Sequence, residues 1–391
     1  MATNTLTSLI PDLYEAMDTV ARELTGMIPS VTLNASSARA AVNSKIRSFV
    51  TPAAASENAT AAQLPPDTGA QVIGTNFLTI TKSKVVPFQW TGEEQLQVAP
   101  GHGHRAMQRD QVAQAIRTLA NEIEVDTWLA GVGGSSRAYG VAGTKAFTYV
   151  AGGGLTDAAG ARRILVDNGC PTTDISLVIG TWEGLNLRAQ ATVQSAADAG
   201  AVALRQQGIL LPLSGMAVRE SAAVTTRVIG TVSATVGTAA YAVGATVLTM
   251  SAAASAIVVG DVITIANDTN QYVVTAISGA SQNAGTITIG TPGLKKAITG
   301  SASPAVTVVA ICNRNVAFHR SAVQLALRTP AVPEEGDMAV DRTVLTDPRT
   351  GISFEFAMYK QYRRVRYEVG AAWGAEAMKQ DFVAQLIGLT G

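Results

Sequence analysis

The stretch from His104 to Ala130 constrains the fold more than any other part of the chain, because its pattern predicts one long amphipathic helix. At about 1.5 Å per residue such a helix spans roughly 40 Å. The run of glycines from Gly131 to Gly134 predicts its end. Apolar residues recur at steps of three and four and therefore share one face: Val112, Ala115, Ile116, Leu119 and Ile123. The polar residues outside this stripe are Gln111, Gln114, Asn121, Glu122 and Glu124.

Length and composition indicate a large protein that hides much of its surface. With 391 residues the chain is too long for one ordinary core, so two or three structural regions are expected. The formal net charge is +0, and 15% of the residues are charged against 47% hydrophobic. A dedicated nucleic-acid binder would carry a basic excess, so this balance argues against that class. Burial of surface against further copies of the same chain would explain the sparse charge.

The N-terminal stretch MATNTLTSLIPDLYEAMDTV has acids where a signal peptide needs a basic start and an apolar core. No apolar run reaches the length of a membrane span, so we expect the chain to be kept in a cytosol. The two cysteines, Cys170 and Cys312, fit that compartment and are expected to be buried thiols.

Two segments that precede the long helix are predicted to leave the core. Ser8 to Leu24 reads as an amphipathic helix and could be an arm that packs on a neighbour. From Arg47 to Val86, two β-prone pieces flank the loop TPAAASENATAAQLPPDTGAQ, which predicts a long two-stranded excursion. A loop of this length is unusual in a compact domain unless it has a partner to lie on.

The region from Gly131 to Val224 is predicted to form an α/β domain. Ala146 to Val150 reads as a strand, Thr156 to Asn168 as a helix with Thr156 or Asp157 at its N-cap, and Asp174 to Gly180 as a buried strand. The segment TWEGLNLRAQATVQS that follows reads as a further helical piece.

The glycines from Gly152 to Gly154 raise an alternative, a cytosolic α/β enzyme whose turn at 152–154 binds phosphate and whose β region is an accessory domain. The dinucleotide fingerprint needs a glycine where Asp157 stands, and no Gly-Lys-Ser/Thr ending follows as in a P-loop. The glycine turn is therefore a weak signal for nucleotide binding.

The composition changes abruptly at Thr225 and stays unusual to Ala310. β-prone segments there alternate and are separated by turn residues, which predicts a small all-β barrel or sandwich inserted into the α/β chain. Helical periodicity is predicted to return around Ala317. The only formally charged residues of the inserted region are Arg227, Asp261, Asp268, Lys295 and Lys296.

Two strands are predicted near the C-terminal end, one over Ile352 to Met358 and one over Val365 to Val369. They bracket the densest positive cluster of the chain, which consists of Arg363, Arg364 and Arg366. A solvated or salt-bridged sheet edge explains this cluster better than a nucleic-acid contact.

No group of residues predicts catalysis or metal binding. With His102, His104 and His319 as the only histidines, no histidine-rich metal site can be assembled. No nucleophile, base and oxyanion donor can be named together, so we expect no enzyme activity, no catalytic, cofactor-binding or metal site, and no cofactor. The paired acids are expected to be solvated: Glu93 and Glu94, Glu122 and Glu124, and Glu334 and Glu335.

The order of these parts resembles the major capsid (coat) proteins of tailed bacteriophages, which share the Hong Kong phage fold. Within that family it resembles the coat proteins of short-tailed enterobacterial phages, which carry an inserted β-barrel domain. Four segments carry the resemblance over nearly the full length: RSFVTPAAAS (Arg47–Ser56), GDVITIAN (Gly260–Asn267), NVAFHRSAVQLALRTPAVP (Asn315–Pro333) and YEVGAAWGAEAMKQDFVAQLIG (Tyr367–Gly388).

The resemblance implies an α+β fold in which Asp126 marks where the long helix leaves its sheet and joins the next domain at Gly131. One insertion loop, NDTNQ (Asn267–Gln271), is shorter than in relatives, where it often reaches the next capsomer. The implied parts are an N-terminal arm (1–31), a peripheral domain (32–130) with an extended loop (about 47–86) and a spine helix (104–130), an axial domain (131–224), an inserted β-barrel domain (225–310), a return to the axial domain (311–346), and the peripheral sheet with the C-terminus (347–391).

The resemblance also implies a function. The chain would self-assemble into hexamers and pentamers that form an icosahedral shell around phage double-stranded DNA. The implied partners are copies of itself, a scaffolding protein during assembly, a portal protein at one vertex, packaged DNA held non-specifically and, as a further candidate, a decoration protein, but no membrane. The implied location is the virion, after assembly in the cytoplasm of a bacterial host.

Overall fold

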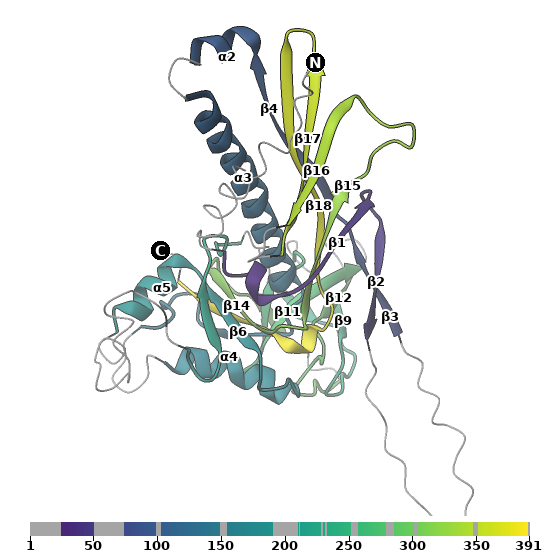
Figure 1. Ribbon diagram of the computed structural model, residues 1–391. Coiled ribbons are helices and arrows are strands. Elements are labelled where there is room, and N and C mark those ends of the chain that lie inside the picture. Colours follow the sequence, from purple (N-terminus) through teal and green to yellow (C-terminus); the bar gives the residue numbers. More distant parts are fainter. Residues whose placement is uncertain are drawn as a thin grey trace, which may run out of the picture.

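The computed structural model describes residues 25–50, 74–98, 103–148, 155–190, 210, 212–227, 230, 233–251, 257–278, 285–300, 303–346 and 351–389. Its described strands form two large sheets and a separate two-stranded ribbon, and one long helix stands along the smaller of the two large sheets (Figure 1). Three predicted features lie outside the described residues: the arm helix Ser8–Leu24, the whole loop at 51–71, and the glycine turn Gly152–Gly154.

One sheet has six strands and is built around β18 (Arg364–Ala377). β4 (Lys82–Thr91) pairs along one edge of β18. β17 (Ser353–Gln361) and β15 (Val323–Pro330) pair with successive parts of the opposite edge. β16 (Ala339–Thr346) then extends the sheet beyond β17, and β1 (Thr32–Ala40) extends it beyond β15 in a parallel pairing.

Helix α3 (Gly103–Gly133) covers one face of this six-stranded sheet, which confirms the predicted long helix. Every residue of its apolar stripe is exposed by 5% or less, and the stripe shares a core with Trp373 and Phe356 of the sheet. The helix continues three residues beyond Ala130, since a glycine weakens a helix without being able to end it where packing holds the last turn.

Asp126, expected to mark where the helix leaves its sheet, lies next to contacts with both sheets. Its carboxylate accepts a hydrogen bond from Trp373 Nε1 of the six-stranded sheet at 2.7 Å. Two residues later, Trp128 Nε1 donates to the carbonyl of Arg314 in the second sheet at 2.8 Å.

The second sheet has eleven strands, six of which close into a barrel. They follow one another in the order β10, β13, β8, β9, β12 and β11, and pairing of β10 with β11 closes the circle. The predicted barrel between Thr225 and Ala310 is therefore present. Its strands are β8 (Ser233–Val236), β9 (Val247–Ser251), β10 (Val262–Ile265), β11 (Gln271–Ser278), β12 (Thr286–Ile289) and β13 (Ala305–Val308).

The barrel joins the rest of the second sheet through β11, which pairs with β5. Helix α4 (Thr156–Asp167) packs on β5 (Arg137–Gly140) and on β19 (Val383–Gly388). This helix confirms the one predicted over 156–168, and β6 (Ile175–Ile179) confirms the strand predicted over 174–180. The remaining elements are β5 (Arg137–Gly140), β19 (Val383–Gly388), β14 (Asn313–His319), β6 (Ile175–Ile179), β7 (Ala217–Glu220), α2 (Gly92–Val98), α4 (Thr156–Asp167), α5 (Thr181–Arg188), and the 3-10 turns η2 (Ile28–Ser30) and η3 (Gln380–Phe382).

Two local predictions are wrong. The region around Ala317 is not helical, because it forms β14, in which every residue from Asn313 to Phe318 is buried. The described part of Ala146–Val150 is a turn rather than a strand, and Phe147 adopts a positive φ of 57°.

The predicted division of the C-terminal third between domains also differs from the strand pairing. Residues 311–346 do not stay together, because β14 lies in the eleven-stranded sheet while β15 and β16 lie in the six-stranded sheet. Residues 347–391 divide in the same way, since β17 and β18 lie in the six-stranded sheet and β19 pairs with β14. Within its C-terminal third the chain therefore crosses between the sheets after His319 and again before Val383.

The ribbon consists of β2 (Lys45–Val50) and β3 (Gly74–Thr79), which pair antiparallel from Lys45 opposite Thr79 to Val50 opposite Gly74. Its base packs on the six-stranded sheet, where Leu78 shares a small core with Ala326 of β15 and Ala372 of β18, and its far end projects from there as predicted for a two-stranded excursion (Figure 1). The excursion is shorter than the predicted 47–86, because Lys82 already begins β4 in the six-stranded sheet.

Among the described helices, none is long and apolar enough to cross a membrane.

Candidate functional site

The described residues contain no cluster of His, Cys, Asp and Glu that could hold a metal ion. His319 is bound to Ser321, with 2.8 Å between its Nδ1 and the hydroxyl oxygen, and burial lowers the pKa of its ring. His102 and the side chain of His104 lie outside the described residues.

A cavity of about 420 Å³ lies between β5, α4 and the loop that precedes β11. Asp157 lines it and accepts the backbone N–H of Phe147 at 2.7 Å instead of capping α4, where Leu155 occupies the N-cap without a capping side chain. Burial raises the pKa of the Asp157 carboxyl. The described lining combines this carboxyl with Arg137, Lys145 and Arg163, and it holds no histidine or cysteine that could serve as a base or nucleophile. The enzyme alternative gains no support from this cavity.

Both cysteines are free and buried, as predicted. Burial raises the pKa of the Cys170 thiol to about 11 and raises that of Cys312 as well. Because the thiolate is the reactive form, neither sulfur is suited to nucleophilic chemistry near neutral pH.

Alkylation of Cys170 by iodoacetamide at pH 8 is expected to be about a hundredfold slower in the folded protein than in urea, since each pKa unit reduces the thiolate tenfold, and alkylation of Cys312 is also expected to be slower. The rate for Cys170 should rise as the pH approaches 11, where its thiolate forms. Mass spectrometry of quenched samples measures the rate at each cysteine. Rapid labelling of Cys170 in a folded sample at pH 8 would contradict the assignment.

Glu124 of α3 is a buried carboxylate that accepts four hydrogen bonds. Its side chain accepts the backbone N–H groups of Gly26, Met27 and Ile28 at 2.7, 2.7 and 2.9 Å, and the hydroxyl of Ser221 at 2.6 Å. Only 2% of Glu124 is exposed, so the expectation that it is solvated is wrong. One carboxylate thereby fixes where the chain that precedes β1 meets both α3 and the segment after β7.

The base of the ribbon is fixed to α3 and β18 by a second group of contacts. Lys82 forms an ion pair with Asp126 at 2.8 Å, and Lys84 pairs with Glu122 at 2.7 Å. The N–H of Thr81 donates to the carbonyl of Trp373 at 3.0 Å. The ribbon therefore projects from a rigid root.

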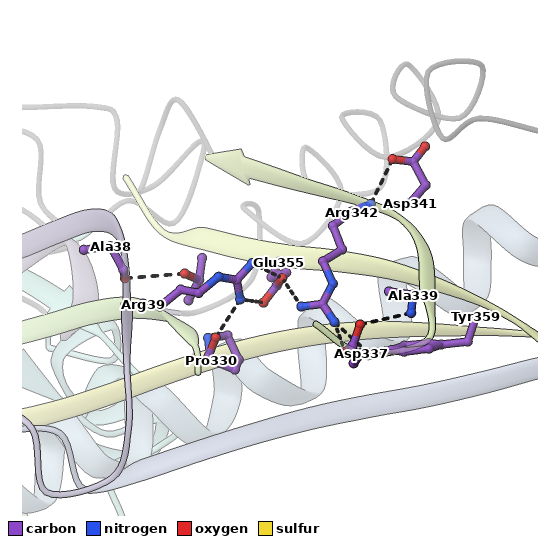
Figure 2. A network of polar contacts seen from close by, with 10 residues as sticks. Ala38, Arg39, Pro330, Asp337, Ala339, Asp341, Arg342, Glu355 and Tyr359 are labelled. Carbon is purple, nitrogen blue, oxygen red and sulfur yellow. Dashed lines mark hydrogen bonds and ion pairs between the residues drawn. The ribbon is translucent and has the colours of Figure 1, made fainter. Parts of the chain in front are cut away.

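A polar network lies at the C-terminal end of β1 (Figure 2). Glu355 of β17 is 5% exposed and accepts two arginines, Arg39 of β1 at 2.9 Å and Arg342 of β16 at 3.0 Å. Arg342 also pairs with Asp337, and Tyr359 donates to Asp337 at 3.0 Å. Two cations bound to a single buried carboxylate give good compensation for its loss of hydration.

This network joins two parts of the chain that lead to projecting segments. Arg39 precedes the ribbon, and its Nη1 also donates to the carbonyl of Pro330 at 2.8 Å. Asp337 ends the loop between β15 and β16, and its carboxylate accepts the N–H of Ala339 at 3.0 Å. The network therefore braces the start of the ribbon and this loop against the same strand, β17.

The arginine cluster predicted at a sheet edge lies at the hairpin between β17 and β18. Arg366 forms an ion pair with Glu368 at 2.5 Å, and Arg364 bonds Gln361. The ion pair agrees with the predicted salt bridging, but the prediction of a sheet edge is wrong, because Arg364 and Arg366 pair with β17 on one side and with β4 on the other. Tyr362 at the tip is 91% exposed.

No protein-family model and no curated protein matches the chain. Solved structures match over most of its length. A chain from Mycobacterium phage Che8 has 15% identity and a TM-score of 0.45 and covers 94% of this chain and 89% of its own. A chain from the capsid of the cyanophage P-SCSP1u has 11% identity and a TM-score of 0.48, with 93% and 87% covered. A chain from the capsid of Myoviridae phage XM1 has 11% identity and a TM-score of 0.44, with 94% and 92% covered. A likeness of this size concerns general architecture and assigns no function.

Proposed function

We propose that this chain is the major capsid protein of a tailed bacteriophage, which self-assembles into hexamers and pentamers of an icosahedral shell around double-stranded DNA. The observation that carries the proposal is the β2–β3 ribbon, a two-stranded sheet of its own that projects from a braced root. A lone two-stranded hairpin is at best marginally stable in water, so an element of this kind gains from lying on a neighbour.

Several further observations support the same function. The sequence resembles coat proteins over nearly its full length, and a closed barrel stands where the inserted domain of that family is expected. The low charge of the chain suits a surface that is buried against copies of itself. Many modest contacts per subunit allow correction of errors during the growth of a closed shell.

The proposal extends to the division into parts. The six-stranded sheet with α3 would be the peripheral domain, and β5, β19, β14, β6 and β7 with α4 and α5 would be the axial domain. Residues 1–31 would be the arm, and the ribbon with its loop would lie over an adjacent subunit. Scaffolding, portal and decoration proteins would be the partners in a bacterial cytoplasm and in the virion, and DNA would be held without sequence preference.

Sedimentation and negative-stain microscopy of the expressed chain, alone and with a scaffolding protein, test this function. We expect shells or ring-shaped capsomers that sediment far faster than a monomer. A small oligomer that stays small at every protein and salt concentration would contradict a coat function.

A further inference from the structure

The ribbon carries its charge on one face. Lys45 and Arg47 lie on the same side of β2, opposite Thr79 and Phe77 of β3, and both cations are exposed. Phe77 is 41% exposed, and Lys45 Nζ lies 5.7 Å from the centre of its ring. The other face turns Leu78, fully buried, toward the root. Two cations and an aromatic ring thus face away from the chain's own core.

These two cations remain without a carboxylate partner in the part of the chain that the structure describes. The described residues of β1 to β4 carry five cations and no acid, and the other three are each paired within the chain. Those pairs are Arg39 with Glu355, Lys82 with Asp126, and Lys84 with Glu122. The surplus of positive charge therefore belongs to the exposed face of the ribbon.

The loop between β15 and β16 has the opposite character. Its sequence AVPEEGDM contains three acids and no base, and Glu334 and Glu335 are exposed. Asp337 is held by Arg342, while Glu334 and Glu335 pair with no cation among the described residues. Met338 beside them is 85% exposed. The loop therefore complements the ribbon face. Each surface carries two charges that have no ion-pair partner among the described residues, the two signs are opposite, and each surface has one exposed apolar side chain.

Both segments start from the same end of the six-stranded sheet. β1 and β15 run parallel and finish together at Ala40 opposite Pro330, and the network around Glu355 braces both chains beyond this point (Figure 2). From there the ribbon and the loop leave in different directions (Figure 1). A heterologous ring contact joins two different surfaces of successive copies, so the ribbon of one chain and the loop of the next are surfaces that such a contact can use.

We propose that the Lys45 and Arg47 face of the ribbon docks on the Glu334 and Glu335 loop of a second copy of this chain. The proposal rests on self-assembly as the function and adds which two surfaces meet. A nucleic-acid partner would suit the ribbon face but would leave the acidic loop unexplained, and the loop matches the ribbon in charge. Charge complementarity of this kind fixes the register of neighbours and steers their association.

Charge exchange in the full-length chain tests the proposal. We expect the double variant Glu334→Lys with Glu335→Lys, and the double variant Lys45→Glu with Arg47→Glu, each to raise the protein concentration needed for assembly by about tenfold, because each turns two attractions into repulsions. The four-residue variant restores the charges in exchanged positions, so it should assemble close to the wild-type concentration.

A matched control changes net charge equally at another place. Glu93→Lys with Asp110→Lys reverses two exposed acids on α2 and α3 and should leave assembly unchanged. The inference would be overturned, with the coat function intact, if the wild-type chain forms shells but the four-residue variant needs as high a protein concentration for assembly as the worse double variant. Weaker DNA retention by the Lys45 and Arg47 variant with normal assembly would assign the face to nucleic acid instead. A wild-type chain that forms no assembly would overturn both.

A disulfide provides a second readout that does not depend on tolerance of charge reversal. Arg47→Cys combined with Glu335→Cys should give covalent multimers on a non-reducing gel after assembly and oxidation, since the native thiols are buried. Arg47→Cys combined with Glu93→Cys is the control and should stay monomeric on the gel. If both cysteine pairs assemble into shells and both run as monomers on the non-reducing gel, the proposed contact would be overturned.

Discussion

Replacement of Glu124 by alanine is expected to lower the free energy of unfolding by about 3–5 kcal/mol, because it leaves buried hydrogen-bond donors without an acceptor. Three of these donors are consecutive backbone N–H groups from Gly26 to Ile28, and the fourth is the hydroxyl of Ser221. The backbone groups cannot move away, since Met27 and Ile28 are themselves packed in the core with α3.

Urea unfolding of the full chain, at a protein concentration below the one needed for assembly and followed by tryptophan fluorescence, measures this loss. Hydrogen exchange adds a local readout, since the amides of Gly26, Met27 and Ile28 should exchange much faster in the variant. Glu122→Ala is the matched control on the same helix: its partner is Lys84 and its side chain is 35% exposed, so the loss should stay within about 1 kcal/mol. Equal losses in the two variants would contradict the role given to Glu124.

The sequence predicts well those elements whose pattern is decided by near neighbours. The stripe on α3 and the short alternating strands of the barrel follow from residues within a few positions of each other. The hairpin of β17 and β18 belongs to the same class, since Phe356 and Val369 stand opposite each other across a short turn and face the same core.

The strand β14 could not be recognised in this way. It lies between β19 and β6 and is buried on both faces, and its buried residues begin with Asn313, Arg314 and Asn315, so its pattern shows no alternation of apolar and polar side chains. Apolar residues without alternation are equally compatible with a buried helix, and neighbouring Val323 and Leu327 happen to fit helical steps. The distribution of the C-terminal strands between the two sheets could not be recognised for a related reason, because β19 reaches its partner β14 from about seventy residues away.

The role of Glu124 was also beyond the sequence. On a helical projection it stands beside the apolar stripe like any solvated acid, and nothing near it identifies a partner. Its partners lie 96 to 98 residues away along the chain, and three of them are backbone groups, which every residue except proline carries. The pairing of Arg39 with Glu355, 316 residues apart, is hidden for the same reason.

Replacement of Gly374 by alanine is expected to unseat the root of the ribbon at a cost of about 3 kcal/mol, because the new methyl group overlaps backbone rather than a movable side chain. Gly374 lies in β18, where an added Cβ would overlap the carbonyl oxygen of Thr79 and come within 3.0 Å of the Cα of Ile80. Thr79 ends β3, and Ile80 begins the turn to β4, where it is fully buried.

A backbone overlap can be relieved only if the ribbon moves off the sheet, and this gives the variant a specific signature. The N–H of Ile80, bonded to the carbonyl of Ser44 at 3.0 Å, should lose protection from hydrogen exchange, while the amides of the barrel strands keep theirs. Gly133→Ala is the control, since nothing lies within 4 Å of its Cβ position and alanine favours a helix by up to about 1 kcal/mol. If the ribbon must be held at a fixed angle to reach a neighbour, Gly374→Ala should also reduce assembly more than its loss of stability explains. Unchanged protection at Ile80 would mean that the root accommodates the methyl group, and the fixed-root argument would fail.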